Sequence, residues 1–121
     1  MHARRALTAL LVGGLTVAAT TPALAHTGLV SSGPKEGAVV AHLPRTVIVN
    51  LSAAPQEVVT SQILFAGADD VATRTRLNPT NARQVRISTR TDRPGAYTVK
   101  IAILLPDGHT QLVSYRFRVR R

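Results

Sequence analysis

From residue 26 onward, the chain consists of short apolar or alternating runs separated by turn residues. No segment sustains the 3.6-residue period of an amphipathic helix, whereas the alternating runs have the two-residue period of strands. Turns are predicted where proline and glycine cluster, for example at Gly33-Pro34 and Asn78-Pro79. The pattern therefore predicts an all-β protein with seven strands, at residues 28–32, 45–52, 58–66, 71–77, 82–89, 96–105 and 111–119.

The last two predicted strands show the clearest alternation. Each has one apolar and one polar side, as expected where one face of a sheet packs on a core and the other meets solvent. Seven such strands in roughly 96 residues fit a small Greek-key β-sandwich of the immunoglobulin-like kind. The chain has no cysteine and no tryptophan, so the hallmarks of antibody domains are absent. The residues expected to face the core are Tyr97, Val99, Ile101, Ile103 and Leu105, followed by Val113, Tyr115, Phe117 and Val119.

The first 25 residues have the three parts of a secretory signal. Arg4 and Arg5 give a positive start, an apolar run follows at residues 6–19, and Ala23-Leu24-Ala25 provides a small-x-small cleavage site. The apolar run is shorter than the roughly 20 residues of a membrane span, so cleavage is favoured over a retained anchor. We therefore expect a signal peptide at 1–25, one domain at 26–121, and export to the periplasm, cell envelope or extracellular space.

The net charge and the amino-acid composition limit the kinds of metal site that the exported domain can form. Residues 26–121 contain 13 Lys and Arg against 6 Asp and Glu. This balance favours anionic surfaces and repels free cations at long range, so a metal site would depend on direct ligation. With no cysteine, and with Met1 as the only methionine, nitrogen and oxygen are the only metal donors of the exported domain.

Cleavage after Ala25 would give His26 a free α-amine. The unperturbed pKa of an α-amine is about 7.7 to 8.0, so a metal can displace its proton near neutrality. The amine and the ring Nδ1 of His26 can then close a chelate around one metal. His26 is therefore the first candidate metal ligand.

A second candidate element is Asp107-Gly108-His109. Residues two apart in an extended segment point to the same side, and a glycine between them leaves room for a shared ligand. One carboxylate oxygen and one imidazole nitrogen would complete a set of three nitrogens and one oxygen, which suits Cu(II). Pro106-Asp107-Gly108 is also an ordinary turn sequence that needs no metal. His42, in a predicted loop, is expected to be a solvated histidine.

These residues resemble the CopC copper-binding proteins of bacterial periplasms and cell envelopes. The resemblance rests on His26 and on four segments in order: GLVSSGPKEGAVV at residues 28–40, RPGAYTVKIAI at 93–103, PDGH at 106–109, and YRFRV at 115–119. It implies Cu(II) ligands at His26, Asp107 and His109, a role in copper carriage, homeostasis or resistance, and no catalytic turnover. The family commonly has F-S-E where this chain has Leu51-Ser52-Ala53, and its glutamate lies near the metal.

The resemblance and the composition also set the expected partners. We expect a monomer that binds copper, works with a membrane copper transporter of the CopD type, and makes weak contact with an anionic membrane or cell-wall surface. Nucleic acid is not expected as a partner of an exported chain with few aromatics. Two alternatives remain open: a histidine-brace copper oxidase, and a metal-free basic module that binds the envelope through its arginines, at positions 83, 86, 90, 116, 118, 120 and 121.

Overall fold

The computed structural model describes residues 28–121, which form nine strands and no helix. All seven predicted strands are present, together with two strands of two residues each that the pattern did not predict. No helix in the described part of the chain is long and apolar enough to span a membrane. The predicted signal peptide and His26 lie outside the described residues. The strands are β1 (Leu29–Gly33), β2 (Val39–Val40), β3 (Thr46–Leu51), β4 (Glu57–Phe65), β5 (Asp69–Asp70), β6 (Ala72–Asn78), β7 (Asn81–Thr89), β8 (Gly95–Leu104) and β9 (Thr110–Val119).

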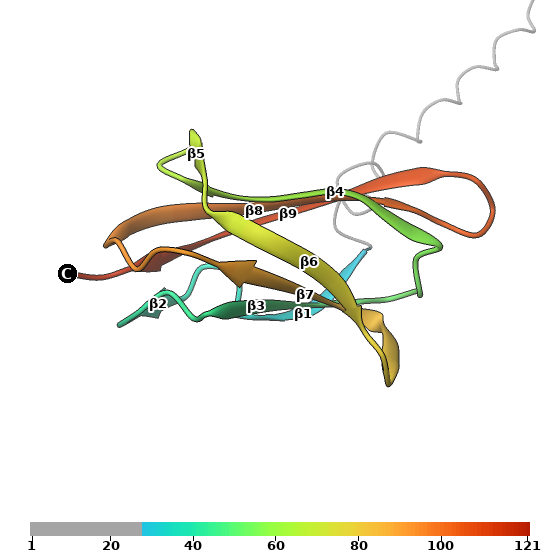
Figure 1. The fold of residues 1–121 in the computed structure, drawn as a ribbon, viewed down its shortest axis with the longest axis horizontal. Helices are drawn as coiled ribbons and strands as arrows, with labels where there is room; N and C mark the ends of the chain where they lie inside the picture. Colours follow the sequence, from blue (N-terminus) through green and yellow to red (C-terminus); the bar gives the residue numbers. More distant parts are fainter. Residues whose placement is uncertain (1–27) are drawn as a thin grey trace, which may run out of the picture.

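The strands form two sheets that pack face to face (Figure 1). One sheet has the order β1-β3-β7-β6, and the other has the order β2-β9-β8-β4-β5. The chain passes between the sheets after β1, β2, β3, β5 and β7, whereas β6–β7 and β8–β9 are hairpins within one sheet. The short β2 pairs with β9 in parallel, and the other pairs are antiparallel. The predicted all-β sandwich is therefore confirmed.

Alternation places the core between the two sheets. In β8 and β9, every second side chain is buried, and the residues between them are exposed or half-buried. The same alternation recurs in β3 and at the centre of β7. No charged or polar residue of the described part is buried, so burial of apolar area holds the sheets together. Between Leu43 and Val119, the chain provides all sixteen buried core residues.

Aromatic side chains fill the core at the end of the sandwich that is distant from the β8–β9 turn. Tyr97 stacks on Phe117 with ring centroids 5.4 Å apart, and its hydroxyl donates a hydrogen bond to the carbonyl of Arg93 at 2.6 Å. Phe65 meets the edge of Tyr97, and the Arg93 guanidinium lies 4.0 Å from the centre of the Phe65 ring. These contacts fix the start of β8 against the end of β9.

The β8–β9 hairpin is the longest pairing in the molecule. It runs from Gly95 opposite Val119 to Leu104 opposite Thr110 without a register shift. Its turn therefore projects at one end of the sandwich, and the C-terminus lies at the other end (Figure 1). Residues 105–109, which contain the Asp-Gly-His element, form this turn.

Candidate metal centre

The turn that carries Asp107 and His109 is closed by its own backbone. The amide of Leu105 donates to the carbonyl of His109 at 2.8 Å, and the amide of Gly108 donates to the carbonyl of Leu105 at 2.9 Å. Gly108 has a φ of +93°, a conformation that side chains disfavour, so glycine is required here by the backbone. The spacing of the Asp-Gly-His element is therefore fixed by the turn itself.

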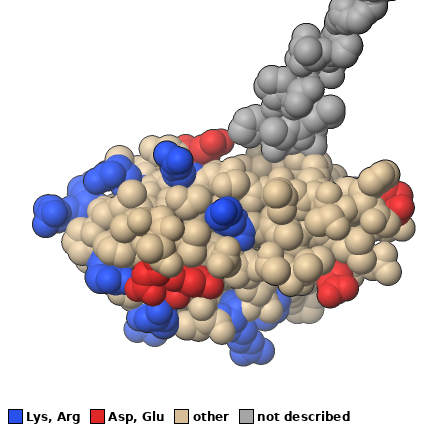
Figure 2. Space-filling view, turned by 90° about the horizontal axis from the view of Figure 1, so that it is seen from above, with Lys and Arg blue, Asp and Glu red and all other residues tan. Residues whose placement is uncertain are grey.

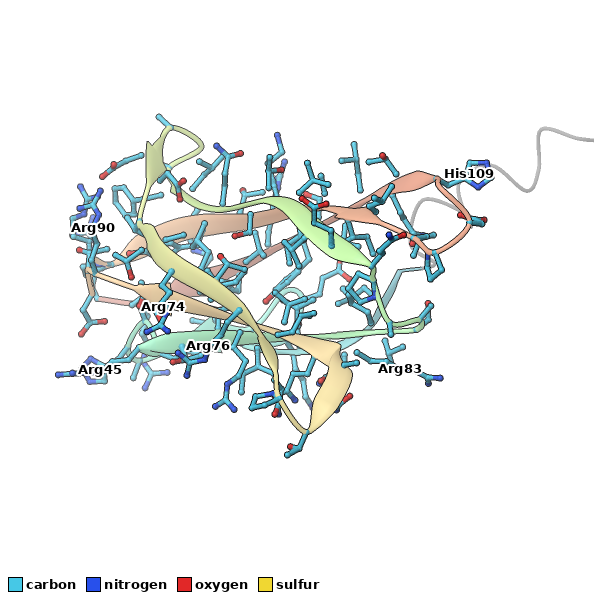
Figure 3. All side chains as sticks on the ribbon, turned by 45° about the vertical axis from the view of Figure 1, so that its right-hand side comes forward. Arg45, Arg74, Arg76, Arg83, Arg90 and His109 are labelled. Atoms are coloured by element: carbon cyan, nitrogen blue, oxygen red, sulfur yellow. The ribbon has the colours of Figure 1, made fainter. Side chains whose placement is uncertain are left out.

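Within this turn, Asp107 and His109 contact each other directly (Figure 3 labels His109). One carboxylate oxygen of Asp107 accepts from the backbone amide of His109 at 2.9 Å, and the other lies 2.9 Å from its ring Nδ1. Both side chains remain open to solvent, with 63% of Asp107 and 82% of His109 exposed. The prediction that the two side chains point to the same side is confirmed by this contact.

The contact shifts both groups toward their charged forms. The hydrogen bond that the ring donates to Asp107, and then the negative charge of Asp107, raise the pKa of the His109 imidazole above its usual 6.5. The hydrogen bonds from the His109 side chain and backbone lower the pKa of the Asp107 carboxyl below its usual 3.8. In the metal-free protein, a proton on Nδ1 therefore links the two groups, and a metal would have to displace it.

The spacing of these two donor atoms suits a metal ion. A first-row divalent ion holds nitrogen and oxygen ligands at about 2.0 Å, which puts two ligands at right angles about 2.8 Å apart. The Nδ1 of His109 and the Oδ2 of Asp107 are separated by 2.9 Å. Both donor atoms are thus close enough to bind one metal ion once the shared proton leaves and the imidazole turns toward the ion.

The start of the described chain lies beside this hairpin. Gly28 is buried between the two sheets, and its carbonyl accepts a hydrogen bond from the Ser52 amide at 3.1 Å. A Cβ on residue 28 would lie 2.7 Å from Cγ2 of Val113 and 3.2 Å from the side chain of Gln111. Gln111 is two residues beyond His109, so Gly28 lies beside the turn end of the hairpin.

Within residues 28–121, no group of three or more histidines and acidic residues could hold a metal ion. Asp107 and His109 provide two donors, and the remaining predicted donors belong to His26, outside the described residues. The complete ligand set therefore stays a prediction. The exposed His42 forms a similar pair, with its Nδ1 3.0 Å from Asp92. Asp92 also accepts from the Leu43 amide at 2.6 Å, which gives that pair a structural role in holding the loop before β3.

Comparison with known proteins establishes the family. Residues 29–120 match the CopC domain. The chain belongs to the CopC domain family. No curated protein sequence matches it at a significant level.

Solved structures give the same fold for this CopC domain. It is similar to CopC from Methylosinus trichosporium OB3b, with 26% identity, a TM-score of 0.68, and coverage of 78% of this chain and 94% of that one. It also resembles PcoC, described as a methionine-rich copper resistance protein from Escherichia coli, with 22% identity and a TM-score of 0.66. That match covers 78% of this chain and 99% of PcoC.

The basic residues of this CopC domain are unevenly distributed. On the face shown in Figure 2, lysine and arginine gather away from the hairpin tip, and the charged side chains visible at the end that carries the tip are acidic. The arginines grouped in the sequence do not form one surface, because Arg86 lies in β7 and Arg116 and Arg118 lie in β9 of the other sheet. The hairpin tip thus projects away from most of the positive charge that would repel a cation.

Proposed function

We propose that this CopC domain is an exported Cu(II)-binding protein that carries or buffers copper in the cell envelope. The proposed ligands are the α-amine and Nδ1 of His26, a carboxylate oxygen of Asp107 and the imidazole of His109. The observation that carries the proposal is the 2.9 Å separation of the Asp107 and His109 donor atoms on one exposed turn. Three nitrogens and one oxygen in a square-planar arrangement favour Cu(II) among the divalent ions.

The position of Gly28 supports the inclusion of His26. Two extended residues span about 7 Å, so the Cα of His26 is within that distance of the Cα of Gly28. Gly28 itself contacts Gln111, which is two residues from His109. His26 therefore has the reach to join the hairpin turn, provided that a signal peptidase cleaves after Ala25 and frees the amine.

The proposed metal ligands of this chain differ from those expected of a protein that carries Cu(I). PcoC is described as methionine-rich, and thioether ligands suit Cu(I). The present chain has Met1 as its only methionine, and Met1 would leave with the signal peptide. The proposed nitrogen and oxygen ligands therefore favour Cu(II) over Cu(I).

An exposed site at the tip of a hairpin fits transfer of copper better than burial of a permanent cofactor. The partner that we propose is a membrane copper transporter of the CopD type, which would approach the site from the hairpin end. This assignment places the protein in copper homeostasis or resistance, outside the cytoplasm, without a catalytic step. The charge distribution is consistent with this role, because few lysine and arginine side chains lie near the hairpin tip to repel an approaching Cu(II) ion.

Titration of Cu(II) against a competing chelator tests the proposal on residues 26–121. Replacing His109 by alanine should weaken Cu(II) binding by roughly 100-fold or more. Loss of a residue that contacts a metal's ligand typically costs about 10- to 100-fold in affinity, and loss of a ligand itself should cost more. Asp107→Asn should weaken it in the same direction. His42→Ala is the matched control, because His42 also forms an exposed pair with an aspartate. If His42→Ala weakened binding as much as His109→Ala, the proposed site would be wrong.

A further inference from the structure

The outer face of the four-stranded sheet carries an unpaired group of arginines, which we call the arginine face: Arg74, Arg76 and Arg86. Arg76 in β6 lies directly opposite Arg86 in β7, and Arg74 lies opposite Ser88. Residues directly opposite one another on antiparallel strands point to the same face, and like charges in that position destabilise a sheet. The neighbours of Arg86 in β7, Val85 and Ile87, are fully buried, so the arginines project to the outside.

No carboxylate of the protein neutralises this face. The chain has six acidic residues, all of them in the described part, and residues 1–27 contain none. The ion pairs in residues 28–121 join Asp69 to Arg90 and Arg93, Asp92 to His42, and Asp107 to His109. In addition, the Nε of Arg86 is buried and has no hydrogen-bond partner within the described residues. The arginine face therefore carries positive charge that no ion pair among residues 28–121 balances.

The rest of the face is mostly polar. Across β7 and β3, the positions beside the arginines are filled by short polar side chains, with Ile48 opposite Arg86 as the apolar exception. Specific protein interfaces usually need large aromatic or apolar anchors at their centre. The arginine face has no aromatic residue, and Arg74 and Arg76 in β6 are exposed whereas Arg86 in β7 is half-buried. Such a surface suits a broad anionic layer better than an acidic protein.

We propose that the arginine face docks this CopC domain on a membrane through anionic phospholipid headgroups. Guanidinium groups pair with phosphate oxygens by bidentate hydrogen bonds, and each arginine near an anionic bilayer adds measurably to binding. Figure 3 shows Arg74 and Arg76 in the left-hand half of the view, away from the hairpin tip that carries His109 at the right-hand end. Docking by this face would leave the hairpin tip free, so it goes beyond the proposed copper binding and does not depend on it.

The test measures binding of metal-free protein, residues 26–121 in EDTA, to vesicles of phosphatidylcholine mixed equally with phosphatidylglycerol. All sixteen core residues of the sandwich lie within this segment. The double variant Arg74→Gln, Arg76→Gln changes two exposed side chains of the edge strand β6. The matched control is Arg116→Gln, Arg118→Gln, which removes the same charge from exposed positions of β9 on the other sheet. Circular dichroism checks that both variants fold.

We expect the unmodified protein to bind the mixed vesicles but not pure phosphatidylcholine, and to dissociate as salt rises to about 0.15 M. The β6 double variant should bind roughly 30-fold more weakly, and the β9 control less than about threefold more weakly. Equal weakening by both variants would show that net charge alone drives binding and would overturn the proposal. Binding to polyglutamate without binding to vesicles would assign the face to an acidic protein and would also overturn it.

Discussion

Gly28 packs so closely against Val113 that a Cβ on residue 28 would lie 2.7 Å from the Cγ2 of Val113. Real side chains do not approach this closely, so the two sheets meet here over a position that admits only glycine. Val113 belongs to β9, the strand that begins one residue after His109. A packing requirement in the core thus fixes where the N-terminal segment enters the fold, next to the proposed metal centre.

Replacing Gly28 by alanine should therefore both destabilise the protein and disturb the metal centre. Overpacking a close contact of this kind costs about 1 to 3 kcal/mol. The shift of the chain at residue 28 should also weaken Cu(II) binding, because His26 is only two residues away. Thermal unfolding and copper titration measure the two effects. Gly33→Ala is the control, since a Cβ at Gly33 meets no atom within 4 Å. Equal loss of stability in both variants would contradict the account.

The contact between Asp107 and His109 should be visible as a raised histidine pKa in the metal-free protein. The hydrogen bond and charge of Asp107 raise the pKa of His109 above 6.5, so Asp107→Asn should lower it toward that value. Proton NMR titration of the imidazole measures the change. The control is His42, whose resonance should be unaffected by Asp107→Asn.

The contact between Asp107 and His109 should also make the stability of the folded protein depend slightly on pH. For His109, the stabilisation is fully present below pH 6.5 and is lost as the pH rises through the raised pKa. For Asp107, it is present above pH 3.8 and is lost as the pH falls through the lowered pKa. An unchanged histidine pKa in the Asp107→Asn protein would show that the two side chains do not interact in solution.

The hydrogen bonds of Asp92 should make the stability of the folded protein fall in acid. The backbone amide of Leu43, and then the side chain of His42, lower the pKa of the Asp92 carboxyl below its usual 3.8. The stabilisation is therefore present above pH 3.8 and is lost as the pH falls through the lowered pKa. Asp92→Asn should lower the melting temperature at neutral pH and reduce its fall on acidification. Glu57→Gln, at the exposed start of β4, is the comparison and should have little effect.

The fold could be predicted from the sequence because alternation is strong in the long strands. Tyr97, Val99 and Ile101 lie on one side of β8, and each is buried. The strands β2 and β5 could not be predicted, because two residues are too few to show a period. Their pairing depends on neighbours distant in the sequence, such as Arg118 opposite Val39.

Part of the candidate site could be predicted because its two described residues are close together in the sequence. Asp107 and His109 are two residues apart, so their contact follows from local geometry. By contrast, the pair of His42 and Asp92 joins residues 50 apart and has no local signal. The arginine face was missed as well, since Arg76 and Arg86 become neighbours only through the register of β6 and β7. Gly28 carried no sign in the sequence that it packs against β9.

The most direct test of the central claim is electron paramagnetic resonance of Cu(II) bound to residues 26–121, compared with the same protein acetylated at the α-amine of His26. If His26 chelates copper through its amine and ring, the native N-terminus should give a square-planar spectrum with three nitrogen ligands. The acetylated protein should lose that signature and bind Cu(II) far more weakly, because its terminal nitrogen is an amide and no longer a free amine. Identical spectra and affinities for the two proteins would contradict the account.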